Sequence, residues 1–125
     1  MTILLADDNA KMRRTIAVIL SDLPATFYEC GDGDEAIESY ARHRPDWVVM
    51  DVRMPRVDGL TACRRIRAAD PAANIIVLTQ YADSDMRSAA LEAGAAEFFS
   101  KDNILALRRF LVDQRIQSNG NQEVP

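Results

Sequence analysis

Five charged or hydroxyl-bearing residues each stand at or just after the end of a short apolar segment. They are Asp7, Asp8, Asp51, Thr79 and Lys101. Three carboxylates that meet in space repel one another, and a hard divalent cation such as Mg²⁺ relieves the repulsion. Lysine and threonine supply a compact positive charge and a hydroxyl donor, which suit the oxygens of a phosphoryl group. If the five residues meet, they predict a carboxylate nucleophile that forms an aspartyl phosphate beside Mg²⁺.

Each of these residues taken alone has an ordinary structural explanation. Asp51 is a common type of turn residue, Asp7-Asp8-Asn9 is a common way to begin a helix, and Lys101 could simply pair with Asp51. The phosphoryl hypothesis therefore depends on whether the five residues occupy equivalent positions, which is a question about the elements that carry them.

Apolar, strand-like segments alternate five times with amphipathic, helix-like segments. The expected strands are 2–6, 25–30, 46–51, 75–79 and 95–99, and a helix follows each of them. Such alternation with short connections predicts an α/β fold, a single doubly wound five-stranded parallel sheet of flavodoxin-like order 2-1-3-4-5, with helices on both faces. Because the carboxyl ends of parallel strands share one edge of the sheet, the five residues should meet there.

Composition refines this arrangement. The run Trp47–Met50 lacks alternation, as a central strand buried on both faces does, whereas 25–30 alternates and carries Glu29, as an edge strand does. Asn9 and Asp58 are expected N-caps. Residues 1–117 are expected to form one domain, and 118–125, which are polar with Gly and Pro, a disordered tail or linker stub.

The whole-chain properties describe an ordinary globular domain. The 125 residues carry a net charge of −4, and 27% of them are charged. The sequence has no block of Lys and Arg residues, so this chain alone is not expected to bind DNA. No apolar segment has membrane-spanning length and no signal peptide stands out, so a cytoplasmic protein without membrane contact is expected. Cys30 and Cys63 lack metal-binding spacing and are expected as reduced core thiols. His43, the only histidine, is expected on the surface.

A set of motifs resembles the response regulator receiver domain of two-component signalling, over about Thr2 to Arg115. The motifs are Ala6-Asp7-Asp8-Asn9, Asp32-Gly33-x-Glu35-Ala36, Met50-Asp51-x-x-Met54-Pro55-x-x-Asp58-Gly59, Leu78-Thr79 and Phe98-Phe99-Ser100-Lys101. The resemblance implies a phosphorylation-dependent switch. A sensor histidine kinase or a histidine phosphotransfer protein would supply the phosphoryl group, and the domain would catalyse only its own phosphorylation and dephosphorylation.

The resemblance also implies a role for each site residue. Asp51 is the implied phosphoacceptor, and Thr79 and Lys101 contact the phosphoryl group. Mg²⁺ is held by Asp7, Asp8, Asp51 and the backbone carbonyl of Arg53. Phe98 matches the switch aromatic of the family, which rotates inward when Thr79 moves toward the phosphoryl group.

Several positions depart from the family pattern or narrow it. Phe98 has no hydroxyl where many relatives have tyrosine, and Gln80 is larger than the residue usual after the threonine. Arg53 and Tyr81 flank the implied path of water to the phosphorus, and because both are large, slow dephosphorylation is expected; an exposed arginine and a packed tyrosine would be the ordinary alternative. The segments around Tyr81 and Asp102 resemble the subgroup with helix-turn-helix output domains, so DNA binding and transcription regulation would require an output domain absent from this sequence.

Two other classes of function are less favoured. An aspartyl phosphatase or phosphotransferase would need a general-acid carboxylate two residues after the nucleophile, where this sequence has Arg53. A flavodoxin-like cofactor binder would need a Ser/Thr/Gly-rich phosphate loop after the first strand, where Asp7 and Asp8 would repel a phosphate.

The last helix carries more apolar residues than one sheet-facing stripe requires. Ile104, Leu107 and Leu111 are expected to face the sheet. A second stripe of Leu105, Val112 and Ile116 could be covered by a second copy of the chain in a homodimer, or could belong to one broad buried face.

Overall fold

Strands and helices alternate along the chain as the hydrophobic pattern predicts. The computed structural model describes residues 1–123, with side chains through residue 117. The strands are β1 (Thr2–Ala6), β2 (Thr26–Cys30), β3 (Trp47–Met50), β4 (Ile75–Thr79) and β5 (Glu97–Ser100). The helices are α1 (Ala10–Ile19), α2 (Gly33–His43), α3 (Gly59–Ala69), α4 (Ser84–Glu92), the 3₁₀ turn η1 (Lys101–Asn103) and α5 (Ile104–Glu123).

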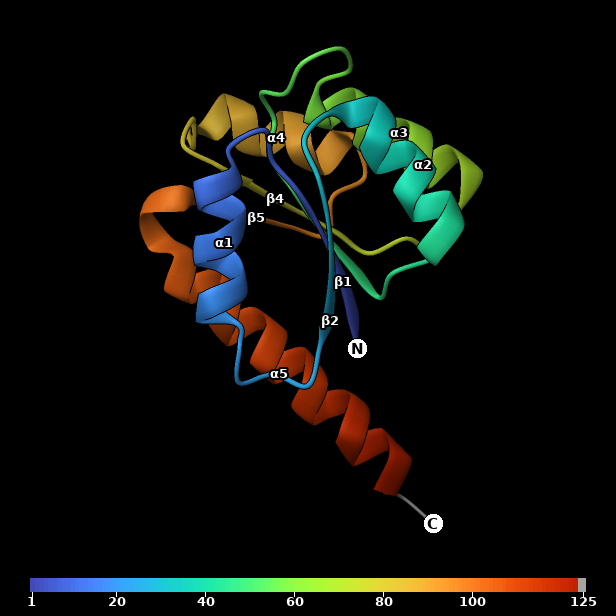
Figure 1. Ribbon diagram of the computed structural model, residues 1–125, viewed down its shortest axis with the longest axis vertical. Helices are drawn as coiled ribbons and strands as arrows, with labels where there is room; N and C mark the ends of the chain where they lie inside the picture. The colour runs from blue at the N-terminus through green and yellow to red at the C-terminus, as the bar shows by residue number, and fades with distance from the viewer. Residues whose placement is uncertain (124–125) are drawn as a thin grey trace.

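The strands form one parallel sheet in the order β2-β1-β3-β4-β5 (Figure 1). This order confirms the predicted flavodoxin-like topology. The register pairs Ala6 of β1 with Met50 of β3, so that Asp7 and Asp51 leave the sheet at the same level. Thr79 of β4 pairs with Ser100 of β5, directly before Lys101. The parallel topology therefore places Asp7, Asp51, Thr79 and Lys101 at the carboxyl edge of the sheet.

The helices cover both faces of the sheet, as predicted. Helices α2, α3 and α4 pack on one face and α1 and α5 on the other (Figure 1). Alternate residues of the central strands divide between the two cores: Leu4 and Val48 face the first group of helices, whereas Ile3 and Val49 face the second. β3 and β4 are buried throughout, while β2 is largely half-buried or exposed, as its expected edge position requires.

Local capping explains where several helices begin. The side chain of Asn9 accepts hydrogen bonds from two amides of α1, and Asp58 accepts one from Thr61 at the start of α3. Asp32 caps α2, while Glu35 accepts a hydrogen bond from the amide of Gly31. These two hydrogen bonds fix the start of α2 at Gly33.

Helix α5 differs from the prediction in length. It continues to Glu123, so the disordered tail expected from Ser118 is helical through that residue, and 124–125 lie outside the described residues. Gly120 costs a helix about 1 kcal/mol relative to alanine but keeps its backbone donor, and no proline occurs between Ile104 and Pro125 to end the helix. The distal part of α5 extends past the edge of the sheet (Figure 1).

The two apolar stripes of α5 have different surroundings. Leu107 and Leu111 are fully buried against the sheet, whereas Leu105 and Ile116 are 64% and 63% exposed. Val112, from the predicted second stripe, packs partly against the same core as Leu107. Over residues 1–123, no helix combines the length and the hydropathy that a bilayer crossing requires.

Both cysteines are buried free thiols, as expected, and burial raises the pKa of Cys30 to about 12 and of Cys63 to about 11. His43 is half-buried instead of exposed, because its ring stacks on Tyr28 with centroids 3.7 Å apart.

Candidate functional site

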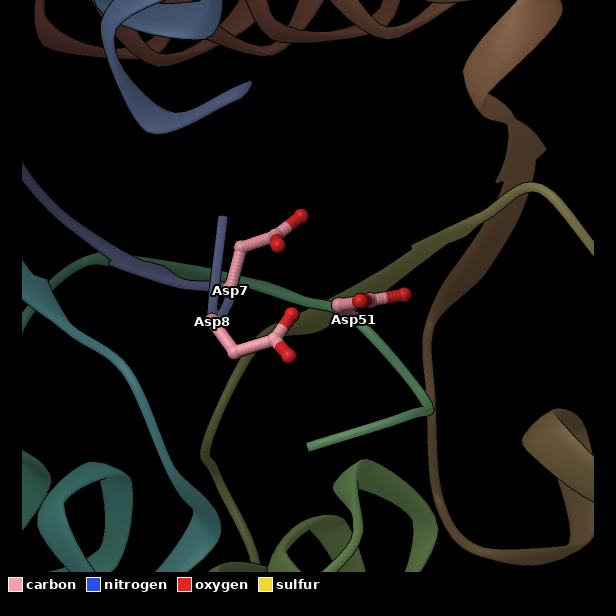
Figure 2. A group of neighbouring side chains, drawn as sticks. All are labelled: Asp7, Asp8 and Asp51. Carbon is pink, nitrogen blue, oxygen red and sulfur yellow. The ribbon is translucent and has the colours of Figure 1, made fainter. Parts of the chain in front are cut away.

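Three carboxylates converge at the carboxyl edge of the sheet. Oxygen atoms of Asp7, Asp8 and Asp51 all lie within 4.8 Å of one another (Figure 2). The strand ladder continues into two of these residues: the amide of Asp7 donates to Cys30 of β2 and that of Asp51 to Ala6 of β1. Asp7 and Asp51 are buried, whereas Asp8 is exposed. The cluster thus has two fixed carboxylates and one at the solvent boundary.

Lys101 bridges the two buried carboxylates. Its Nζ lies 2.7 Å from Asp7 and 3.2 Å from Asp51, and its side chain is only 13% exposed. Burial and the charge of Asp7 raise the pKa of Asp51 even though Lys101 opposes the shift. Burial disfavours the charge on Lys101, but its hydrogen bonds to Asp7 and Asp51 and their charges outweigh this cost and raise its pKa.

A cavity of about 230 Å³ opens above these charges. The residues that line it are Asp7, Asp8, Asn9, Asp51, Arg53, Gln80, Tyr81 and Lys101. Because a water molecule occupies about 30 Å³ in the liquid, the cavity can hold a phosphoryl group together with several waters. The guanidinium of Arg53 lies 4.0 Å from the centroid of the Tyr81 ring, in cation–π contact. These two side chains together form one wall.

Thr79 is near the site but does not line the cavity. It is the last residue of β4 and is fully buried, and its hydroxyl accepts a hydrogen bond from the amide of Tyr81 at 3.2 Å. Phe98, the expected switch aromatic, is 7% exposed and packs into the core on the α2, α3 and α4 face. The ring therefore occupies an inward position.

The donor set fits a hard divalent cation. Asp7, Asp8 and Asp51 offer carboxylate oxygens to a common point, and Mg²⁺ binds through a few such oxygens while keeping several waters. The exposure of Asp8 leaves room for those waters, and within the described residues Asp8 has no cationic partner. These three residues would supply the carboxylate ligands of the ion.

Two features of the site could not be predicted from the sequence. The side chain of Arg13 on α1 is largely buried, and its Nη1 donates to the backbone carbonyl of Asp7 at 2.6 Å. Gly59 lies so close to Asp51 that a Cβ placed on it would stand 1.8 Å from the carbonyl oxygen of Asp51. The signal for Gly59 was its place directly after the N-cap Asp58, but the close approach itself is a long-range packing effect.

Comparison with protein families matches residues 3–109 to the Response regulator receiver domain. The response regulator MprA of Mycobacterium leprae is 39% identical over 116 residues, covering 90% of this chain and 51% of that protein. The transcriptional regulatory protein PdtaR of Mycobacterium tuberculosis is 40% identical over 100 residues, covering 79% of this chain and 48% of that protein. The chain thus spans about half the length of these curated relatives.

A solved structure supports the same assignment. The crystal structure of the BeF3-activated N-terminal receiver domain of RstA from Klebsiella pneumoniae superposes with a TM-score of 0.81 at 28% identity, covering 90% of this chain and 97% of that one. The acidic edge, the bridging lysine, the sheet order and these similarities agree: the chain belongs to the response regulator receiver domain family.

Proposed function

We propose that Asp51 is the phosphoacceptor of a signalling switch that this receiver domain forms. The observation that carries the proposal is the bridge of Lys101 between Asp7 and Asp51, at the edge where parallel strands end. A lysine in this position compensates two buried carboxylates before any phosphoryl group arrives. It can then transfer its contacts to phosphoryl oxygens.

The proposed transfer follows from the positions of these groups. An oxygen of Asp51 attacks the phosphorus of a phosphohistidine, the phosphorus–nitrogen bond breaks, and the released imidazole takes a proton from solvent. Lys101 and the Thr79 hydroxyl then contact the new phosphoryl oxygens. Asp7, Asp8, Asp51 and the backbone carbonyl of Arg53 would hold Mg²⁺, which would supply positive charge to balance the charge of the phosphoryl group.

The same geometry supports a proposed response to phosphorylation. If the Thr79 hydroxyl donates to the phosphoryl group, its hydrogen bond with the Tyr81 amide changes, and with it the start of the β4–α4 connection. Phe98 lies on the adjacent strand β5 and is the proposed switch aromatic. Arg53 and Tyr81, stacked on one another, shield the phosphorus from water and slow dephosphorylation in this proposal.

The wider context is also proposed. The phosphoryl group comes from a sensor histidine kinase or a histidine phosphotransfer protein in the cytoplasm, and the domain has no catalytic activity beyond its own phosphorylation and dephosphorylation. Residues 1–117 form the receiver unit, and any contact with DNA is made by an output domain outside this sequence. A homodimer through α5 is also proposed, because the side chains of Leu105 and Ile116 on this helix are exposed.

Acetyl phosphate with Mg²⁺ tests the phosphoacceptor. Intact-mass spectrometry of the wild type is expected to show one added phosphoryl group, and the Asp51→Asn variant none. Asp46→Asn is the control, because Asp46 is an exposed carboxylate before β3, at the opposite edge of the sheet. An equal adduct on wild type and Asp51→Asn would refute the assignment.

Sedimentation tests the dimer. Beryllofluoride, a mimic of the phosphoryl group, is expected to increase self-association of the wild type but not of Leu105→Asp. A monomer in both states at high concentration would exclude α5 as a homodimer surface.

A further inference from the structure

We infer that Arg13 is a positioning residue that holds the Asp7–Asp8 loop in its ion-binding geometry and thereby sets the affinity for Mg²⁺. This inference rests on the proposed function of the acidic site. Arg13 touches neither the cavity nor the proposed phosphoacceptor, so its effect would be transmitted through the backbone of Asp7.

The contacts of Arg13 tie the loop to two secondary-structure elements. From helix α1, its Nη1 donates to the carbonyl of Asp7 at 2.6 Å, and its Nε forms an ion pair with Glu29 of β2 at 2.9 Å. The side chain is 20% exposed. A Cβ placed on Gly31 would stand 3.8 Å from Nη1 and 3.9 Å from the Cα of Asp8. The guanidinium is thus enclosed between α1, the end of β2 and the back of the acidic loop.

The other restraints on Asp7 leave its carbonyl to Arg13. The amide of Asp7 is held by Cys30, and its carboxylate accepts from the Asn9 amide at 2.9 Å while contacting Lys101. The carbonyl of the peptide that joins Asp7 to Asp8 accepts the hydrogen bond from the Arg13 side chain, and this bond restrains the orientation of the peptide. Because that peptide sets the direction in which Asp8 leaves the backbone, fixing its carbonyl fixes where the exposed carboxylate points.

Two opposite effects of Arg13 on a cation can be distinguished by their chemistry. A positive charge behind the site repels Mg²⁺, but the ion pair with Glu29 offsets much of that charge. Positioning favours binding, and loss of a residue that orients metal ligands typically weakens affinity about 10- to 100-fold. Lysine retains the charge but lacks the planar fork that reaches two acceptors, so it should not replace arginine here.

The experiment compares Arg13→Met, Arg13→Lys and Arg14→Met, the last being an exposed neighbour on the same helix. Calorimetric titration with Mg²⁺ alone measures affinity without any phosphoryl donor. Both Arg13 variants are expected to bind about 10-fold more weakly than wild type, and Arg14→Met to bind as wild type. In acetyl phosphate labelling, the half-saturating Mg²⁺ concentration should rise by the same factor, while the rate at saturating Mg²⁺ is retained.

Each alternative gives a different pattern. If Arg13 acts only through charge, Arg13→Met binds Mg²⁺ more tightly and Arg13→Lys is unchanged, which overturns the inference. Wild-type affinity in both Arg13 variants also overturns it. If these variants fail to fold, as thermal unfolding in EDTA would show, Glu29→Asp keeps the negative charge but shortens the side chain that holds Arg13. This variant should still weaken Mg²⁺ binding, and unchanged binding would then overturn the inference. Failure of the proposed function is separate, since it appears as labelling of Asp51→Asn.

Discussion

Replacement of Asp51 by asparagine is expected to stabilise the metal-free protein at neutral pH. Asp51 is buried beside Asp7, and both burial and the charge of Asp7 raise the pKa of its carboxyl. Its ionised form is therefore costly in the folded state. Asparagine has a similar shape, and its side-chain oxygen can still accept from the amide of Val52, which now donates to Asp51 at 2.9 Å.

The magnitude follows from three terms. At an effective dielectric constant of about 20, Asp7 and Asp51, whose oxygens lie within 4.8 Å, repel by about 3 kcal/mol. Lys101 at 3.2 Å attracts Asp51 by about 5 kcal/mol on the same scale. Burying the charge costs about 3 to 4 kcal/mol, within the several expected for a buried ion. Lys101 still pairs with Asp7 in the variant. The three terms therefore sum to a net stabilisation of about 1 to 2 kcal/mol, or roughly 3 to 12 °C in Tm.

The pH dependence has a defined sign. The folded-state pKa of Asp51 is raised above the unfolded value, so the stability linked to its protonation is fully present below the unfolded pKa and is lost as pH rises through the folded pKa. The advantage of Asp51→Asn should therefore be absent in acid, appear as pH rises through the raised pKa, and reach its full size above it.

Urea unfolding in EDTA measures the effect. Trp47, the single tryptophan, is 9% exposed and reports the loss of the core. Asp113→Asn, an exposed site on α5 with the same change in net charge, is the control and should be neutral. With Mg²⁺ at 100 times its dissociation constant, the wild type should gain about 2.7 kcal/mol and the order should reverse. A variant less stable than wild type in EDTA, or an advantage independent of pH, would refute the reasoning.

Three further predictions concern other parts of the site and core. Double replacement of Arg53 and Tyr81 by alanine should accelerate loss of the phosphoryl group by about 10-fold or more because the stacked wall is removed, and an unchanged decay of the phosphorylated mass would contradict the shielding role. Gly59→Ala should destabilise the fold by about 2 to 3 kcal/mol in urea unfolding, because its Cβ collides with backbone, whereas Gly31→Ala, with ordinary contacts only, should not. Burial raises the pKa of the Cys30 thiol to about 12, so this thiol should resist iodoacetamide at pH 8 in the native protein and react fully in urea. Rapid labelling of the native protein would show that the thiol is accessible.

The residues at the strand ends could be predicted from the sequence because parallel topology places all carboxyl ends at one edge. Asp7, Asp51 and Lys101 meet there for that reason alone. N-caps such as Asn9 were predictable as well, since a cap depends only on residues two or three positions away.

The contacts that escaped prediction depend on distant partners. The direction of the Arg13 side chain depends on its partner Glu29, which lies 16 residues later on β2. The length of α5 was misjudged because a glycine and polar residues weaken a helix without ending it. Thr79 was correctly placed at a strand end, but its hydroxyl is engaged by Tyr81, a local turn contact that strand patterns do not encode.

The backbone hydrogen bonds that join Asp7 and Asp51 to the sheet limit which part of the site can change conformation. These two residues are held by the amide network of β1, β2 and β3, so half of the site behaves as a rigid support. The other half, 80–85, is exposed throughout, and helix α4 behind it buries only Ala90. Segments with so little buried apolar contact open at low free energy, and their amides exchange with solvent early. We therefore expect a change at the acidic edge to alter the conformation of the β4–α4 segment, because the residues on the other side of the site are held by the sheet.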